Sequence, residues 1–252
     1  MNFKRKKILI TGASQGLGAM VAENLSHYGA ELILVSSSEK KLKIILNKCK
    51  NKKLHTYYVC DFQNLKKIKA LRVDLSKKFS KLDIIMHFAG GGLGIKNDLP
   101  KYDEYIQVFN LNLFSIMEIN REMIGLLKKS SHSTIFHVGS IAAKESVGSV
   151  SYNIAKSALN SYVRSLSKSL IKFNICVTGI NPGGFEYRGN AMHRLKIKNP
   201  KAYKDFISKR MIIKRMPNAK ELFPLILTLI SENNFAYTGN MINCDFGEGK
   251  FY

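Results

Sequence analysis

Tyr152 and Lys156 are two residues whose types and spacing could perform proton chemistry. Side chains four residues apart lie on the same face of a helix. There a lysine ammonium can lower the pKa of a tyrosine phenol from its ordinary value near ~10, which makes the phenol a candidate general acid. Of the 11 tyrosines, Tyr152 alone has a lysine four residues later. The same spacing is also typical of a solvated helix face, so the surrounding elements decide between the two interpretations.

Composition limits the class of protein. The 252 residues are 45% hydrophobic and 23% charged, which is ordinary for a soluble globular protein. No apolar run approaches the ~18 residues of a membrane span, and the run Ile8–Ile10 is too short for a secretory signal. The four cysteines show no CxxC spacing, which argues against a metal site. We expect reduced, mostly buried thiols and a cytoplasmic location.

The net charge of +22 would suit an anionic partner such as a nucleic acid or a membrane surface. However, basic residues are spread from Lys4 to Lys250, with no aromatic-interleaved stripe and no recognisable nucleic-acid-binding module. Lysine is abundant together with isoleucine and asparagine, as in a compositional bias of the source. We therefore expect neither nucleic acid nor membrane as the main partner.

A glycine-rich turn near the start of the chain could bind a phosphate group. The apolar run Lys6–Ile10 predicts a buried strand, and the turn that follows opens directly into a helical apolar pattern. Gly12, Gly16 and Gly18 permit a tight turn and a close approach of backbone to a pyrophosphate at the positive end of the helix dipole. A second apolar strand, Glu31–Ser36, follows this helix. The context predicts a dinucleotide site.

Strands and helices alternate along the rest of the chain. Further strands are predicted at His55–Cys60, Leu82–Phe88, Thr134–Val138 and Ile175–Ile180, with a last one ending at Asp245, and long helices at Tyr102–Lys129, Ser151–Phe173 and Glu221–Ile230. Right-handed crossovers would join these strands into a doubly wound parallel sheet. We expect a single α/β domain over residues 1–252, with ligands at the carboxyl ends of the strands.

The spacing Gly-x-x-x-Gly-x-Gly, followed downstream by Tyr152-x-x-x-Lys156, resembles the short-chain dehydrogenase/reductase family over nearly the whole chain. The resemblance implies a Rossmann-like sheet of about seven strands with helices on both faces. It also implies hydride transfer between a nicotinamide and a substrate carbonyl, with the proton given by Tyr152. Lys156 would depress the Tyr152 pKa and bind the nicotinamide ribose. Ser140 would orient the carbonyl, and Asn112 would support a proton relay.

The same resemblance implies a set of cofactor-binding residues. They are Gly12, Ser14, Gln15, Gly16, Leu17, Gly18, Ser36, Ser37, Asp61, Phe62, Ala89, Gly90, Tyr152, Lys156, Pro182 and Gly183. NADP(H) is favoured, because no aspartate ends the second strand and the stretch Ser36–Lys41 offers hydroxyls and lysines to a 2′-phosphate. NAD(H) remains an alternative, since Gln15 stands where many NADP-dependent relatives carry a basic residue. The serines also fit a plain polar loop.

Some positions depart from the family pattern or admit a second role. Asp61 fits the position that contacts the adenine ring, and it can also cap the following helix. Asn112 fits the catalytic asparagine better than Asn110 does. His87 and Phe88 replace two asparagines of the family's Asn-Asn-Ala-Gly. On a central strand, His87 is expected to be a hydrogen-bonded core residue rather than a catalytic one.

The segment of about 184–218 corresponds to the family's substrate loop. It carries ten basic residues against Glu186 and Asp205. This excess suits an anionic substrate, such as a phosphorylated or nucleotide-linked sugar or an acyl group on a carrier protein. Background lysine richness explains the excess equally well.

The stretches Asn199–Tyr203 and Asp245–Lys250 resemble reductases linked to surface-polysaccharide sugar synthesis. The first hypothesis is therefore an NADP(H)-dependent enzyme that interconverts a ketone and a secondary alcohol on a sugar or nucleotide-sugar. A 3-oxoacyl-carrier-protein reductase is the second, and a non-catalytic nucleotide sensor or an RNA-associated protein are further alternatives. The resemblance also implies a homodimer or homotetramer that pairs through the helices bearing Asn112 and Tyr152.

Overall fold

The computed structural model describes residues 2–250, and its central feature is one seven-stranded parallel sheet. The strands lie in the order β3-β2-β1-β4-β5-β6-β7. They are β1 (Lys7–Thr11), β2 (Glu31–Ser36), β3 (Thr56–Val59), β4 (Ile84–His87), β5 (Ser133–Val138), β6 (Ile175–Pro182) and β7 (Met241–Cys244). The order reverses between β1 and β4, the kind of switch point at which open α/β sheets bind ligands. The predicted doubly wound parallel fold is confirmed.

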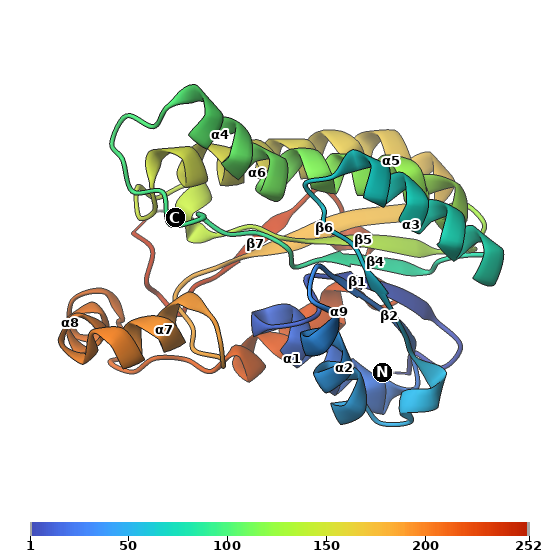
Figure 1. The fold of residues 1–252 in the computed structure, drawn as a ribbon, viewed down its shortest axis with the longest axis horizontal. Coiled ribbons are helices and arrows are strands. Elements are labelled where there is room, and N and C mark those ends of the chain that lie inside the picture. Colours follow the sequence, from blue (N-terminus) through green and yellow to red (C-terminus); the bar gives the residue numbers. More distant parts are fainter. Residues whose placement is uncertain (1, 251–252) are drawn as a thin grey trace.

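Helices cover both faces of the sheet. They are α1 (Gly16–Leu25), α2 (Glu39–Lys48), α3 (Leu65–Lys78), α4 (Tyr102–Phe109), α5 (Ser115–Leu127), α6 (Val150–Leu170), α7 (Ala191–Lys198), α8 (Pro200–Arg210) and α9 (Phe223–Leu229). Figure 1 shows α1, α2 and α9 on one face, and α3, α4, α5 and α6 on the other. Successive residues of β1 serve the two cores, since Ile8 and Ile10 pack with α1 and α9 while Leu9 packs with α3 and α5.

The long helix predicted over Tyr102–Lys129 is interrupted. Residues Asn110–Phe114 form a π-helical segment between α4 and α5. Within it, Asn112 Nδ2 donates to the Val108 carbonyl oxygen at 2.9 Å. That carbonyl is the one that the backbone N–H of residue 112 would reach in an α-helix, so the side chain takes over a helix bond. Such bulges often occur at functional sites.

Two predicted helix starts are displaced. Asp61 does not cap α3, because Asn64 does so: its Oδ1 accepts from two backbone N–H groups of the first turn at 3.0 and 3.3 Å. Asp61 instead accepts from a backbone N–H within its own turn. The helix predicted over Glu221–Ile230 is α9, and a short 3₁₀ turn at Ala219–Leu222 precedes it.

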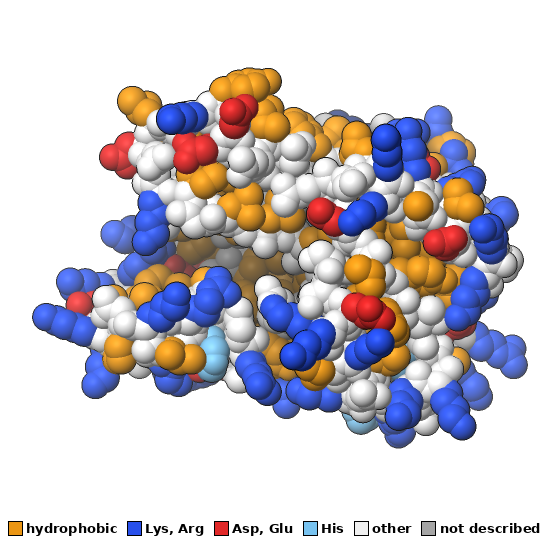
Figure 2. All heavy atoms as spheres, viewed as in Figure 1, with side chains coloured by type: hydrophobic (Ala, Val, Ile, Leu, Met, Phe, Trp, Pro, Cys, Tyr) orange, Lys and Arg blue, Asp and Glu red, His pale blue; other side chains and the backbone are white. Residues whose placement is uncertain are grey.

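Basic side chains are distributed over the surface rather than gathered in one stripe. Figure 2 shows Lys and Arg on both helical layers of the visible face. Within residues 2–250, no helix combines the length and the hydrophobicity that crossing a membrane requires. Cys49, Cys60 and Cys176 are buried free thiols, and Cys244 is partly exposed, in agreement with the sequence.

The amino-terminal edge of the sheet carries a buried carboxylate, far from the ligand-binding edge. Asp83 is 1% exposed and accepts hydrogen bonds from Lys7 N at 2.9 Å and from Ser130 Oγ at 2.6 Å. It also accepts from Lys81 Nζ at 2.8 Å. These donors replace the water that a carboxylate loses on burial, so Asp83 ties the starts of β1, β4 and β5 together.

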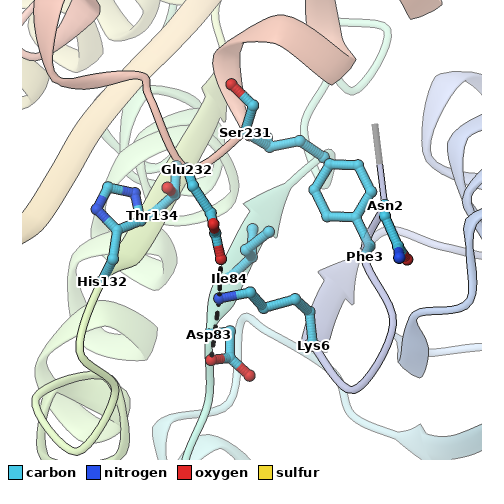
Figure 3. A pocket seen from close by; sticks show the side chains of 10 residues that line it. Asn2, Phe3, Lys6, Asp83, Ile84, His132, Thr134, Ser231 and Glu232 are labelled. Atoms are coloured by element: carbon cyan, nitrogen blue, oxygen red, sulfur yellow. Dashed lines mark ion pairs between the residues drawn. The ribbon is translucent and has the colours of Figure 1, made fainter.

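A cavity of about 180 Å³ lies beside this carboxylate. Figure 3 shows Lys6 at its wall between Asp83 and Glu232. The Lys6 Nζ atom is 2.9 Å from the Glu232 carboxylate and 3.9 Å from that of Asp83. Because the cavity opens at the amino ends of the strands, its ionic groups stabilise the fold rather than form the predicted site.

Asp83→Asn is expected to lower the free energy of unfolding at pH 7 by ~2–4 kcal/mol, because the buried donors lose their anionic acceptor. Burial opposes ionisation, but the bonds from Lys7, Lys81 and Ser130 outweigh it and hold the Asp83 pKa below its ordinary value of 3.8. The carboxylate therefore stabilises the fold above that value, and this contribution is lost as pH falls through the lower folded pKa. Urea unfolding at pH 7 and pH 3 measures both effects.

The matched control is Asp74→Asn. Asp74 forms an exposed ion pair with Lys77 at 3.8 Å, which is worth less than ~1 kcal/mol. Equal losses of stability in the two variants would contradict the role given to Asp83.

Candidate active site

Lys156 is a buried cation beside the carboxyl end of β5. Its side chain is 3% exposed, and its Nζ donates to the carbonyl oxygen of Val138 at 2.9 Å. Burial lowers the Lys156 pKa to about 8. A desolvated ammonium with a single carbonyl partner destabilises a fold, and groups of this kind cluster at functional sites.

Tyr152 lies one turn earlier on α6, where its side chain is partly exposed. Burial raises the pKa of its phenol, and a hydrogen bond with the Ser140 side chain opposes that rise. The prediction that Lys156 lowers the Tyr152 pKa is therefore wrong for this structure. The Lys156 Nζ lies 5.6 Å from the centre of the Tyr152 ring and is bound to the Val138 carbonyl instead. The phenol is protonated at neutral pH and can donate its proton.

Ser140 follows β5 and is held from both sides. Its backbone N–H donates to Asn181 Oδ1 at 3.1 Å, and its Oγ accepts from Ala142 N at 3.1 Å. The second bond caps the short turn Ile141–Ala143. Because the serine is fixed in this way, its side chain stays within hydrogen-bonding reach of the Tyr152 phenol.

Asn112 is fully buried and fastens the loop that follows β4. Its Oδ1 accepts from Gly91 N at 3.0 Å, and its Nδ2 donates to the Gly91 carbonyl at 2.9 Å. A Cβ added to Gly90 would lie 2.9 Å from Asn112 Oδ1 and 3.3 Å from Lys156 Nζ. Asn112 and Lys156 therefore meet at Gly90, where there is no room for a side chain.

The glycine-rich turn forms a cradle that fits a dinucleotide. Gly12 has a φ of +67°, and a Cβ there would lie 2.6 Å from Ala89 N, so the ends of β1 and β4 are in close contact. A Cβ on Gly18 would lie 2.6 Å from the Gly12 carbonyl oxygen. A Cβ on Gly16 would have no atom within 4 Å, so open space lies beside that residue. Helix α1 has no side-chain cap from Gln15 and no acid in its first turn. Its N–H groups remain available for a pyrophosphate.

Hydroxyl groups and a lysine gather at the end of β2, beside this cradle. The Ser36 Oγ donates to the Ser14 Oγ at 2.7 Å, and Lys41 Nζ donates to Gln15 Oε1 at 2.8 Å. Ser37 is exposed. Within residues 2–250 no carboxylate is bonded to these hydroxyls or to Lys41, so the group suits an additional phosphate on the ribose better than free ribose hydroxyls.

The remaining predicted cofactor residues also lie at the carboxyl edge of the sheet. Asp61 and Phe62 follow β3, and Pro182 and Gly183 stand at the end of β6. The Phe62 side chain is buried in the core packed by α3, and the Leu17 side chain in the opposite core. These two residues can offer only their backbone to a ligand, because their side chains point away from it.

His87 behaves as predicted for a core residue. Its Nε2 lies 2.8 Å from Asn120 Oδ1, and the Asn120 amide donates to the Tyr162 hydroxyl at 3.1 Å. Its ring lies 5.0 Å from that of His137 on the neighbouring strand. Burial lowers the His87 pKa to about 4 and holds that of His137 well below its ordinary value. Both rings are therefore neutral at pH 7 and serve packing.

The predicted substrate loop folds as a separate layer. Its two helical pieces are α7 and α8, and Glu186 pairs with Asn218 where the segment leaves and rejoins the body. Figure 2 shows the surface hollowed between α7–α8 and the layer bearing α4 and α6, with hydrophobic side chains inside the hollow. Within residues 2–250, no group of three or more His, Cys, Asp or Glu side chains could hold a metal ion.

The sequence did not indicate two further residues at this edge, Glu248 and Arg210. The Glu248 carboxylate is buried and bonded both to the turn after β6 and to Arg210 at the end of α8. A glutamate between two glycines carries no signal of burial, so only the tertiary structure reveals the pair.

Lys156→Met is expected to raise the free energy of unfolding at pH 7 by ~1–3 kcal/mol, because it removes a buried charge while it fills a similar volume. The penalty of the charged lysine is fully present below pH 8 and is relieved as pH rises towards 10.5, its ordinary value. The stability gain should therefore shrink across that interval in urea titrations. Lys168→Met, at an exposed position of α6, is the control and should change little. A destabilised Lys156→Met protein at pH 7 would refute the assigned cost.

Comparison with known proteins identifies related reductases. A 3-oxoacyl-(acyl-carrier-protein) reductase from Rickettsia typhi is 30% identical over 184 residues, which cover 73% of this chain and 74% of the relative. A reductase of the same name from Buchnera aphidicola of Acyrthosiphon pisum is 27% identical over 252 residues, 98% of both chains. The solved structure of L-sorbose reductase from Gluconobacter frateurii, complexed with NADPH and L-sorbose, has the same fold. It aligns with a TM-score of 0.91 at 23% identity and covers 100% of this chain and 99% of its own.

The family model that describes short chain dehydrogenases matches residues 6–196. This span contains the glycine-rich cradle, Asn112, Ser140, Tyr152 and Lys156. By the extent of this match, the chain belongs to the short-chain dehydrogenase family and is an oxidoreductase.

Proposed function

We propose that this protein is an NADP(H)-dependent reductase that converts a ketone into a secondary alcohol. The observation that carries the proposal is the grouping of a protonated phenol, a fixed serine and a buried ammonium beside a phosphate-sized glycine cradle. A proton donor and a dinucleotide site at one edge of a sheet are the two parts that carbonyl reduction needs.

In this proposal the bound nicotinamide supplies the hydride that reduces the carbonyl carbon. Tyr152 gives its proton to the carbonyl oxygen, and Ser140 holds that oxygen in line through its hydroxyl group. The Lys156 ammonium, which lies beside Gly90 and 5.6 Å from the centre of the Tyr152 ring, would bind the ribose of the nicotinamide. Asn112 keeps the loop at Gly90 and Gly91 in place beside the ammonium.

The resting protonation state of Tyr152 suits the reductive step. Because burial raises the Tyr152 pKa, the phenol is the stable form at neutral pH and acts as an acid. Reduction needs that acid at the start, whereas oxidation of an alcohol needs the phenolate. Before a substrate binds, the site therefore holds the proton that reduction consumes.

NADP(H) is the proposed cofactor. The Ser14 and Ser36 hydroxyls and Lys41 support a 2′-phosphate at the end of β2. Structural neighbours and relatives of the family include proteins named for NADPH or NADP. The chain would act as one nucleotide-binding domain with the substrate loop at about 184–218, because a single sheet supplies all the predicted contacts.

For the substrate, we favour a 3-oxoacyl thioester held on an acidic carrier. Exposed hydrophobic side chains stand on the segments that border the hollow: Leu99 is 91% exposed, Ile197 67% and Ile212 71%. An acyl chain can bury this apolar surface, while the lysines of α7 and α8 would attract an acidic carrier. The relatives named 3-oxoacyl-(acyl-carrier-protein) reductase support the same class. A sugar or nucleotide-sugar ketone in surface-polysaccharide synthesis is the competing hypothesis from the sequence.

We further propose a cytoplasmic homodimer or homotetramer that pairs through α4, α5 and α6. Exposed hydrophobic side chains on this layer support the pairing, with Phe114 at 42%, Met117 at 39% and Ile154 at 46%. Burying such groups would stabilise an interface between copies. A monomeric mass in light scattering at micromolar concentration would contradict it.

A substrate panel tests the proposed function. The purified protein is incubated with NADPH or NADH and with 3-oxoacyl thioesters, free keto sugars and nucleotide-linked keto sugars, and kcat/KM is measured for each pair. We expect NADPH with a 3-oxoacyl thioester to give the highest value. A higher value for a keto sugar would replace the thioester assignment. A kcat/KM with NADH equal to or above that with NADPH would remove the cofactor assignment. If no ketone in the panel oxidises NADPH, the proposed function is refuted.

Tyr152→Phe is expected to reduce kcat by ~10²–10⁴, because the variant lacks the proton donor but keeps the ring. NADPH binding, followed by fluorescence, should remain. Tyr162→Phe on the same helix is the control, since its hydroxyl accepts a bond from Asn120 in the core and should affect stability rather than turnover. A Tyr152→Phe enzyme with undiminished kcat would show that another group supplies the proton.

A further inference from the structure

The C-terminal segment places one buried carboxylate between two parts of the proposed site. The Glu248 side chain is 3% exposed, although glutamate is almost never fully buried without a partner. We propose that Glu248 is a positioning residue that fixes the turn after β6 and the end of α8 in one arrangement. The inference rests on the proposed function, because Pro182 and Gly183 in that turn are predicted cofactor contacts and α8 borders the substrate hollow.

One oxygen of Glu248 holds the turn. Oε2 accepts the backbone N–H of Gly184. A Cβ on Gly183 would lie 2.7 Å from the same oxygen and 2.8 Å from the Asp245 Cβ, so the turn is pressed directly against the C-terminal segment. The carboxylate thus serves as the acceptor for a partly buried N–H group.

The other oxygen holds the substrate-loop layer. Oε1 lies 2.6 Å from Arg210 Nη2 at the last residue of α8. The Arg210 guanidinium stands 5.0 Å from the centre of the Phe206 ring, and that ring would lie 3.0 Å from a Cβ on Gly184. Phe206 and Arg210 therefore both reach the Gly184 turn from α8, one by packing and one through Glu248.

The backbone of the C-terminal segment is shaped to present this carboxylate. Asp245 accepts from Gly247 N at 3.1 Å and from Gly249 N at 3.0 Å, which closes a tight turn around Glu248. Phe246 has a φ of 58°, an uncommon conformation for a side chain of that size. A Cβ on Gly247 would meet Ile212 at 3.0 Å, so the segment following α8 also rests on this turn.

The charges around Glu248 make its bond to Arg210 decisive. Arg210 is the cation that faces the carboxylate, whereas Asp245 and Glu145 add negative charge nearby. Removal of the Arg210 partner leaves a buried anion next to two other acids, and removal of Glu248 takes away the acceptor of the partly buried Gly184 N–H and the ion-pair partner of Arg210. Because the turn and α8 are bonded to the same carboxylate, neither can shift without breaking one of its two bonds. Their positions are thereby coupled.

Glu248→Gln tests the coupling with the smallest change of shape. The amide can still accept from Gly184 N but loses the ion pair with Arg210. We expect hydrogen exchange in peptides covering 183–186 and 200–210 to be faster by roughly tenfold or more, as for a loosened local unit. We also expect the Kd for NADPH and the KM for the ketone each to rise by roughly three- to tenfold, while kcat falls less. The pattern separates positioning from proton transfer.

The matched control is Glu232→Gln. It breaks the Lys6–Glu232 ion pair, which has a 2.9 Å contact, is more exposed and lies at the amino-terminal edge of the sheet, outside both monitored peptides. Arg210→Gln and the double variant complete the set, and the double variant should be no worse than the worse single one. Normal exchange and normal NADPH affinity in Glu248→Gln, or additive losses in the double variant, would overturn the inference.

The exchange measurement needs no substrate, so it separates the two proposals. If the wild-type protein fails to bind NADPH, the proposed function fails while faster exchange in Glu248→Gln still supports the coupling. If Glu248→Gln loses only thermal stability with unchanged exchange in these two peptides, Glu248 is an ordinary core residue and the positioning role is refuted.

Discussion

The buried ammonium of Lys156 is the constraint around which the site is built. An ammonium removed from water must find acceptors, and here the nearest is the Val138 carbonyl at the end of β5. Helix α6 packs against β6 and carries Lys156 to the end of β5, with Tyr152 one turn earlier. The ammonium also explains why Gly90 has no side chain, since a Cβ would crowd both Lys156 and Asn112. One buried charge thus lies where α6, the end of β5 and the loop after β4 meet.

The groups at this site lower the stability of the fold but are able to react with a ligand. The opposite edge of the sheet shows the contrast, because Asp83 there is surrounded by donors and stabilises the fold. At the ligand edge, Lys156 has one carbonyl, the Tyr152 phenol has a raised pKa, and α1 begins without a side-chain cap. Each group has spare bonding capacity that a ligand can satisfy. The amino-terminal edge of the sheet therefore stabilises the fold, and the carboxyl-terminal edge is available to bind a ligand.

Much of this could be predicted from the sequence, because periodic features encode it. Apolar runs separated by helical patterns predict a doubly wound parallel sheet, and the glycine spacing predicts the cradle. The direction of the Tyr152 pKa could not be predicted, since it depends on burial and on where the Lys156 Nζ points. The π-helical segment and the cap at Asn64 depend on which of several nearby polar side chains forms the hydrogen bond with the backbone. Glu248 was hidden because its partners come from remote segments.

The Glu186–Asn218 pairing has a consequence for how the protein could change over evolution. Glu186 N donates to the Pro217 carbonyl at 2.8 Å, and Ala219 N donates to the Glu186 carbonyl at 3.1 Å. The substrate loop therefore leaves the body of the protein and returns to it at the same point. Apart from Phe206, Arg210 and Ile212, which contact the Gly184 turn or the C-terminal segment, the residues between these two points can be lengthened, shortened or exchanged without moving a strand of the sheet. New substrates can thus be acquired by replacing one insert while the proton donor and the nucleotide cradle stay unchanged.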